Sequence, residues 1–207
     1  MGVLSGLLRS GFHPGQYRRR AVHAAQGLIT ALLVLLSAGS AVLAQPAAGD
    51  TRAELQQVLP QAQLVGKGRL TFWGFQVYDA RLWANPGFGA GSFTAEPLAL
   101  ELAYLRDFDS RAVAERSISE MRRAAPVSEL TAEKWMSAMA RVLPDVKKGD
   151  RVMGVHRPGV GASFWMNGKP LGDIRDAEFA RLFFGIWLAP TTSEPGLRTA
   201  LLAGAAP

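Results

Sequence analysis

The sequence predicts an α+β domain in which an antiparallel sheet is covered by helices. β-branched and aromatic residues dominate 64–83 and 98–105, two amphipathic helical segments occupy 109–143, and strand-like segments follow at 149–156 and 161–167. The late strands are joined by tight turns. Such turns favour antiparallel pairing, because parallel strands need long crossover connections.

The N-terminal segment 1–44 is predicted to be a secretory signal peptide. A basic cluster, Arg18 to Arg20, precedes the uncharged apolar run Leu28 to Leu36, and small residues follow up to a cleavage site after Ala44. The destination is then periplasmic or secreted. A retained membrane anchor is the alternative, although the apolar run is short for a span, and the arginines leave Sec and twin-arginine export both open.

After cleavage, residues 45–53 are expected to form a flexible lead-in and residues 54–207 a single domain. The chain carries a net charge of +6, but its leader contributes Arg9, Arg18, Arg19 and Arg20 and no acid, so the mature charge is 6 − 4 = +2. This balance gives no support to nucleic-acid binding. With no cysteine in the chain, disulfides, thiolate metal sites and a cysteine nucleophile are excluded.

The first strands come from two segments. Residues 64–83 form one long strand, or two with a bend at Gly74, and the turn at 85–91 ends this part. The following segment, 98–105, alternates so that one face of a strand carries Leu98, Leu100, Leu102 and Tyr104.

The helices come next. Asp109 or Ser110 can cap a helix that runs to Arg123, and Thr131 is the expected N-cap of a second helix to Leu143. Further along, Asn167-Gly168 is a strong hairpin turn. A helix at 177–188 with an apolar stripe and a short helix at 196–203 complete the domain.

Few residues offer recognisable catalytic or metal chemistry. His156 is the single histidine after residue 44, it lies at a strand end, and no Gly-x-Ser-x-Gly motif accompanies it, so we interpret it as a surface or structural residue. Carboxylates are scattered without a metal-ligand spacing. We therefore expect no metal and no cofactor, and we assign no catalytic residue.

The aromatic stretch TFWGFQVYDARLW, residues 71–83, carries the strongest local signal. In strand alternation Arg69, Thr71 and Trp73 share one face, while Phe72 and Tyr78 share the other. Either face can be core. If the face with Arg69 lines a cleft, it combines a cation, a hydroxyl and apolar walls, which suits an amphipathic ligand with an anionic or phenolic head.

The chain from about 66 to 204 resembles the bacterial chalcone isomerase-like family. Five segments carry the resemblance in order: GFQVYDARLW at 74–83, LELAY at 100–104, PDVKKGD at 144–150, NGKPLG at 167–172 and FFGIWL at 183–188. The resemblance implies an open-faced β-sandwich of the chalcone isomerase type, with a long antiparallel sheet covered by helices.

The resemblance also implies two kinds of function. The plant isomerases cyclise a chalcone without a cofactor, and they use a threonine on the Val-Tyr strand; that place falls on Trp73 here, with Thr71 two residues away. The helix after Tyr104 does not contain the isomerase pattern Tyr-x-x-Lys-x-x-x-Asn. Other members of the fold bind fatty acids in plastids, where an arginine and a tyrosine hold the carboxylate.

We therefore expect an exported, non-catalytic protein that binds a small amphipathic or lipid-like ligand through Arg69, Thr71, Trp73 and Tyr104. Arg69 and Tyr104 are the expected pair for the head group, and their side chains must then converge in one pocket. Two alternatives remain: a cofactor-free isomerase or lyase with Arg69 stabilising an oxyanion, and an envelope protein-interaction module. We expect membrane contact only through an uncleaved leader.

Overall fold

The computed structural model describes residues 52–207, and these form one six-stranded antiparallel sheet with the strand order β1-β2-β3-β4-β5-β6. The strands are β1 (Gln63–Phe72), β2 (Phe75–Ala84), β3 (Leu98–Tyr104), β4 (Arg151–Arg157), β5 (Gly161–Met166) and β6 (Lys169–Ile174). Each strand therefore pairs with its sequence neighbour. The predicted α+β class with antiparallel pairing is confirmed.

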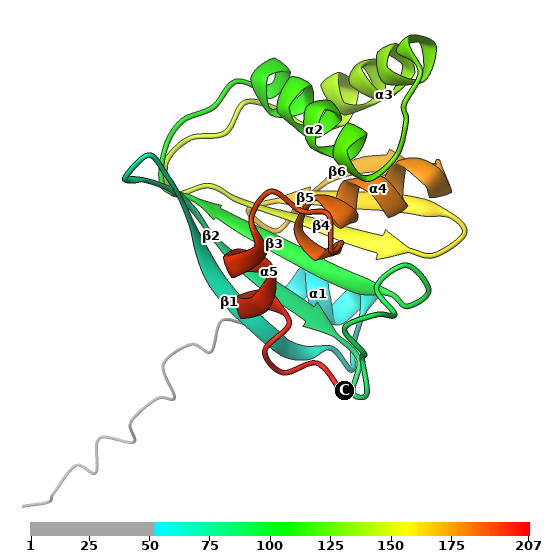
Figure 1. The fold of residues 1–207 in the computed structure, drawn as a ribbon. Helices are drawn as coiled ribbons and strands as arrows, with labels where there is room; N and C mark the ends of the chain where they lie inside the picture. The colour runs from blue at the N-terminus through cyan, green and yellow to red at the C-terminus, as the bar shows by residue number, and fades with distance from the viewer. Residues whose placement is uncertain (1–51) are drawn as a thin grey trace, which may run out of the picture. The chain divides into compact units, whose positions relative to one another are not determined.

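Helices lie on both faces of this sheet (Figure 1). One face is covered by α2 (Ser110–Ala124), α3 (Glu129–Val142), α4 (Ala177–Leu188) and α5 (Pro195–Leu201), while the short α1 (Ala53–Val58) lies against the other. α4 packs on β4 and β5, whereas α2 packs mainly on α3 and α4. This arrangement leaves space between α2 and the sheet.

The main core lies on the face under α4. Cross-strand neighbours Leu82, Leu100, Gly154 and Phe164 form one row across β2 to β5. The predicted face of β3 is confirmed, because Leu98, Leu100, Leu102 and Tyr104 are all buried. β3 is therefore a central strand with a large apolar face toward the helices.

The opposite face is closed by α1 and a buried ion-pair cluster. Glu101 on β3 is inaccessible to solvent, and its carboxylate accepts hydrogen bonds from Arg52, Arg81 and Arg151. Arg151 also bonds Glu54 on α1 at 2.5 Å. Burial raises the pKa of Glu101, but the bonds and charges of Arg52 and Arg151 outweigh it and hold that pKa low, so the carboxylate stays ionised.

Helix starts follow the expected capping chemistry with one shift. Asp109 accepts from the backbone N–H of Ala112 and caps α2, as predicted. Ser128, not Thr131, caps α3 and accepts from the N–H of Thr131. Both residues can cap, and the helix extends to the earlier one because Glu129 and Leu130 tolerate helical geometry.

Of the two alternatives for residues 64–83, the structure has two strands that are separated at Gly74. A two-residue turn at Trp73 and Gly74, with φ values of 50° and 79°, reverses the chain between β1 and β2. β1 lies at one edge of the sheet. The predicted turn at Asn167 and Gly168 is confirmed, and it has the same backbone form, with φ values of 52° and 81°.

Within residues 52–207 no helix has the length and apolar character needed to cross a bilayer. The predicted signal peptide and its cleavage site after Ala44 lie outside the described residues.

Candidate functional site

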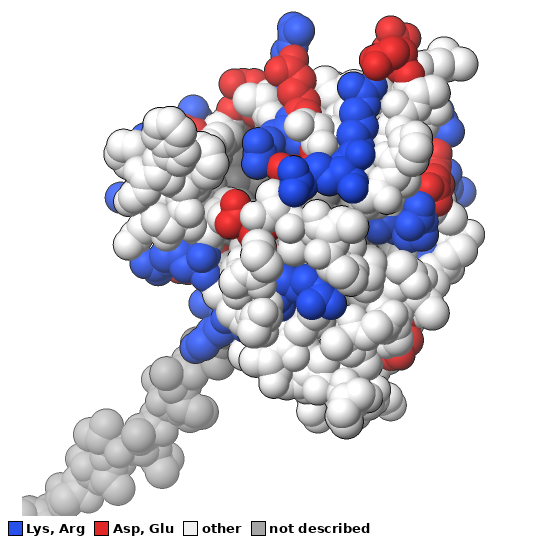
Figure 2. Space-filling model, viewed as in Figure 1, with Lys and Arg blue, Asp and Glu red and all other residues white. Residues whose placement is uncertain are grey.

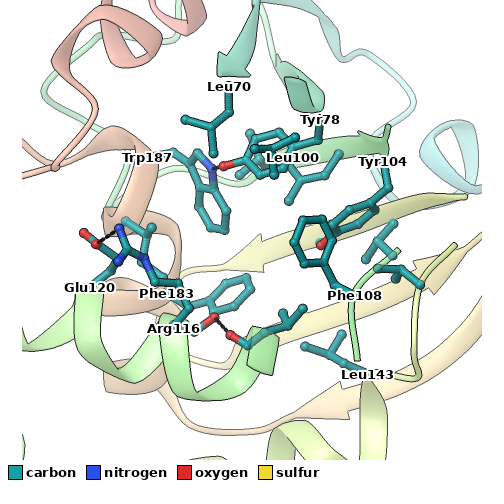
Figure 3. Close-up of a pocket in the computed structure, with 18 of the residues that line it drawn as sticks. Leu70, Tyr78, Leu100, Tyr104, Phe108, Arg116, Glu120, Leu143, Phe183 and Trp187 are labelled. Carbon is teal, nitrogen blue, oxygen red and sulfur yellow. Dashed lines mark hydrogen bonds and ion pairs between the residues drawn. The ribbon is translucent and has the colours of Figure 1, made fainter. Parts of the chain in front are cut away.

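A cavity of about 400 Å³ lies between the sheet and the helix layer (Figure 3). Strands β1 to β5 form its floor, and α2, α4 and the segment after α3 form its walls. The residues lining it include Leu70, Phe72, Tyr78, Leu100, Leu102, Tyr104, Phe108, Ala112, Val113, Arg116, Ser117, Glu120, Pro144, Phe164, Phe183, Trp187 and Glu194. Most of these side chains are apolar, and the volume lies within the range of small-molecule sites.

Closely packed aromatic side chains line one side of the cavity. Phe183 on α4 packs edge-on against Phe164 on β5, with ring centroids 5.5 Å apart, and against Trp187, also at 5.5 Å. Gly154 on β4 has no side chain, and a Cβ there would approach the rings of Phe164 and Phe184 to 3.2 and 3.3 Å. These rings form a stiff apolar wall.

One hydrogen bond joins the two layers beside the cavity. The indole Nε1 of Trp187 donates to the hydroxyl oxygen of Tyr78 at 2.9 Å. Burial raises the pKa of Tyr78 well above its usual range, so the phenol stays neutral.

Tyr104 supplies a polar group inside the cavity. Its side chain is buried, its ring packs edge-on to Tyr78 at 6.0 Å and lies 5.9 Å from Phe108, and its hydroxyl makes no hydrogen bond with any residue of the described part. Burial raises the pKa of Tyr104 to about 12. A buried hydroxyl with an unused donor can bind an oxygen or nitrogen acceptor of a ligand.

Arg116 and Glu120 on α2 form the charged part of the lining, and Figure 3 shows them across the cavity from Tyr104 and Phe108. Their side chains pair at 2.7 Å, and Arg123 lies 3.6 Å from the same carboxylate. Two arginines around one glutamate leave a net charge of +1. Arg116 is largely exposed while Glu120 is buried, so the guanidinium faces solvent at the rim.

The mouth of the cavity can be located from exposure. Four of its lining residues are exposed: Phe72 at the end of β1, Ala112 and Arg116 on α2, and Pro144 after α3. The opening therefore lies between the β1–β2 turn and the N-terminal half of α2.

Of the four predicted ligand-binding residues, only Tyr104 lines this cavity. Arg69 pairs in register with Asp79, which in turn pairs with Ala103, so Arg69 projects on the opposite sheet face from Tyr104. Its guanidinium makes two bonds, at 2.6 and 2.9 Å, to Asp79. The expected convergence of Arg69 and Tyr104 in one pocket is wrong.

Thr71 and Trp73 lie at the exposed end of the hairpin and do not line the cavity. The cavity uses the other face of the stretch, through Leu70, Phe72 and Tyr78. The sequence does contain a signal for this face. Leu70, Phe72 and Tyr78 are all even-numbered, so strand alternation places them on the same side. Arg116 and Glu120 were missed because their i, i+4 spacing is also typical of a solvated helix face.

His156 is a core residue. It is buried, its ring lies 5.2 Å from that of Phe184, and burial lowers its pKa against the opposing effect of hydrogen bonds with the backbone of Glu96 and Phe93. Within residues 52–207 no group of histidine, aspartate and glutamate side chains is arranged to hold a metal ion.

Comparisons with known proteins bear on the fold. The model of a family described as chalcone isomerase-like matches residues 50–203. A Haemophilus influenzae protein described as uncharacterized is 27% identical over 140 residues, which cover 68% of this chain and 67% of that protein. The crystal structure of an Arabidopsis thaliana fatty-acid binding protein superposes with a TM-score of 0.53 at 12% identity, covering 69% of this chain and 87% of the other. This likeness confirms the expected fold.

Proposed function

We propose that this chain, which belongs to the chalcone isomerase-like family, binds a small amphipathic, lipid-like acid and does not catalyse a reaction on it. The observation that carries the proposal is the apolar cavity of about 400 Å³ with a charged rim at one side and an unpaired hydroxyl at the other. An apolar cavity with a few placed polar groups is the usual form of a ligand site. The solved relative of the same fold is described as a fatty-acid binding protein, which supports the same class of ligand.

The polar groups suggest how such a ligand lies. A carboxylate is costly to bury without a cation, so the anionic head belongs at the mouth, near Arg116. The apolar body extends between Phe183 and Leu102. Tyr104 can then donate to a neutral oxygen farther along the ligand.

The chemistry of the lining favours binding over isomerisation. Arg69, the candidate oxyanion stabiliser of the isomerase alternative, is engaged with Asp79 on the other sheet face. Burial keeps the Tyr78 and Tyr104 phenols protonated near neutral pH, which makes them hydrogen-bond donors and poor general bases.

A fluorescent long-chain fatty acid tests the proposal. We expect saturable binding by the wild-type chain and at least a tenfold loss of affinity in Val113→Trp, which places an indole in the cavity. Val160→Trp is the matched control, because Val160 is 53% exposed in the β4–β5 turn. Thermal unfolding of both variants checks that they fold. Ala112→Phe is a second variant that places a larger side chain in the cavity. Unchanged affinity in the two folded filling variants would overturn the proposal.

We also propose that the protein acts after export, with a mature chain beginning at Gln45. The support is the basic, apolar and small-residue order of segment 1–44. Expression in a Gram-negative host, followed by periplasmic extraction and N-terminal sequencing, should give a chain that starts at Gln45. A full-length chain in the membrane fraction would instead support a retained anchor.

A further inference from the structure

The turn between β1 and β2 holds a bulky residue in a backbone conformation that disfavours it. Trp73-Gly74 and Asn167-Gly168 have nearly the same pair of positive φ values. Asparagine and glycine tolerate this left-handed region, whereas for a tryptophan it is strained. The chain thus contains the same type of turn twice, once with a residue that favours it, Asn167, and once with a residue that does not, Trp73.

Trp73 gains little packing in return for this strain. Its side chain is 86% exposed, and the neighbouring Phe72 and Phe75 are 51% and 61% exposed. Its ring is tilted against that of Phe72, with the centroids 6.0 Å apart. Three exposed aromatic side chains on a convex turn are unusual for a free surface and mark an interaction site. We call Phe72, Trp73 and Phe75 the aromatic tip.

A cation lies against the aromatic tip. The Arg106 guanidinium lies 4.7 Å from the centre of the Phe75 ring. Lys148 is a second cation of this end of the sheet, because its backbone N–H bonds Asp107, the residue after Arg106. Within the described chain, neither Arg106 nor Lys148 forms an ion pair, whereas Asp79 and Asp107 are paired with Arg69 and Lys147. Figure 2 shows the tip as an uncharged lobe at the left of the view, with Lys and Arg atoms at its margins.

The geometry points to the aromatic tip as a docking site for an anionic lipid bilayer. Tryptophan and phenylalanine side chains insert at the headgroup level, and flanking cations bind the negatively charged surface. The tip is continuous with the cavity, because Phe72 belongs to both and the mouth lies beside it. Docking would therefore place the mouth at the bilayer, where a lipid-like ligand can enter or leave. This last step rests on the proposed function; the docking itself does not.

The experiment uses a fluorescent label at a single site. Because the chain has no cysteine, Gln76→Cys in the full-length protein can carry an environment-sensitive NBD group beside the tip. Val160→Cys, in the exposed β4–β5 turn, is the matched control. Each labelled protein is mixed with vesicles of phosphatidylcholine alone or with phosphatidylglycerol. The local signal separates docking by the tip from binding through the N-terminal segment.

We expect a several-fold rise and a blue shift of emission at position 76 with the anionic vesicles, little change at position 160, and loss of the response in Trp73→Asn. That substitution suits the turn, so the variant should fold. The response should survive Val113→Trp, which separates docking from ligand binding. No change at position 76, an equal change at both positions, or a response that persists in Trp73→Asn would overturn the inference. A concentration-dependent change without vesicles would also overturn it and indicate self-association.

Discussion

The indole of Trp187 on α4 donates a 2.9 Å hydrogen bond to the hydroxyl of Tyr78 on β2, and both side chains line the cavity. The residues are 109 positions apart in the sequence, so this bond joins α4 near the end of the chain to the second strand. It fixes the position of α4 over the sheet at one wall of the site.

Tyr78→Phe should lower the free energy of unfolding by about 1 to 3 kcal/mol, because it leaves the buried Trp187 N–H without its acceptor. Trp187→Phe should also lower the free energy of unfolding, because it removes packing of the indole as well as the bond. Since the two residues share one bond, the double variant should cost less than the sum of the single ones. Urea denaturation of the four proteins measures this coupling; strictly additive losses would contradict the bond's contribution.

Arg116→Gln should weaken the binding of a long-chain acid by roughly tenfold, as expected for the loss of a charge-assisted contact worth about 1.5 kcal/mol. The alcohol of the same chain should lose less affinity. Arg69→Gln is the matched control, since it also removes an arginine from an ion pair but lies on the other sheet face. Displacement titrations provide both affinities. Equal losses in the two variants would place the head group elsewhere.

Asp176 makes stability depend on pH. Burial raises the pKa of its carboxyl, but hydrogen bonds from Lys134, the N–H of Phe179 and Trp135 outweigh it and lower the pKa to about 2 from 3.8. The folded-state value is the lower one, so this stabilisation is complete above pH 3.8 and is lost as the pH falls toward 2.

Asp176→Asn should therefore cost about 2 kcal/mol at neutral pH. The difference in unfolding free energy between the variant and the wild type should become smaller as the pH falls from 4 to 2. Denaturation curves over this range check the sign, with Asp173→Asn as the surface control. A gap that widens in acid would contradict the assignment.

Trp73→Asn should stabilise the fold by about 1 kcal/mol, because it relieves the left-handed strain in the β1–β2 turn. Chemical denaturation measures the change, and Asn167→Trp should produce the opposite effect in the β5–β6 turn. If Trp73→Asn destabilised the protein, the tryptophan would have a packing role and the argument from strain would fail.

The sequence predicts the fold well because the spacing of apolar residues and the residue types of turns are local properties. The alternation of Leu98, Leu100 and Leu102 predicted the large apolar face of β3, and Asn167-Gly168 predicted a hairpin. Helix α4 matches its predicted range because an apolar stripe is bounded by Asp176 and Pro190.

The site was less predictable because it depends on which face of a strand meets the helices. Alternation groups Arg69 with Asp79 and Leu70 with Tyr78, but it does not tell which group is covered. A break at Gly74 was one of the two alternatives, but the tight hairpin at Trp73-Gly74 was not predicted, since a tryptophan is atypical in such a turn. Recognising that turn makes Arg69 and Asp79 cross-strand partners, which removes Arg69 from the site.

Lipid binding is tested most directly by mass spectrometry of the protein purified from its native cells, under native and then denaturing conditions. We predict one amphipathic, lipid-like acid bound per chain, released on denaturation and absent from Val113→Trp purified in parallel. A protein that is empty when isolated, and that also fails to bind the fluorescent fatty acid, would contradict this prediction.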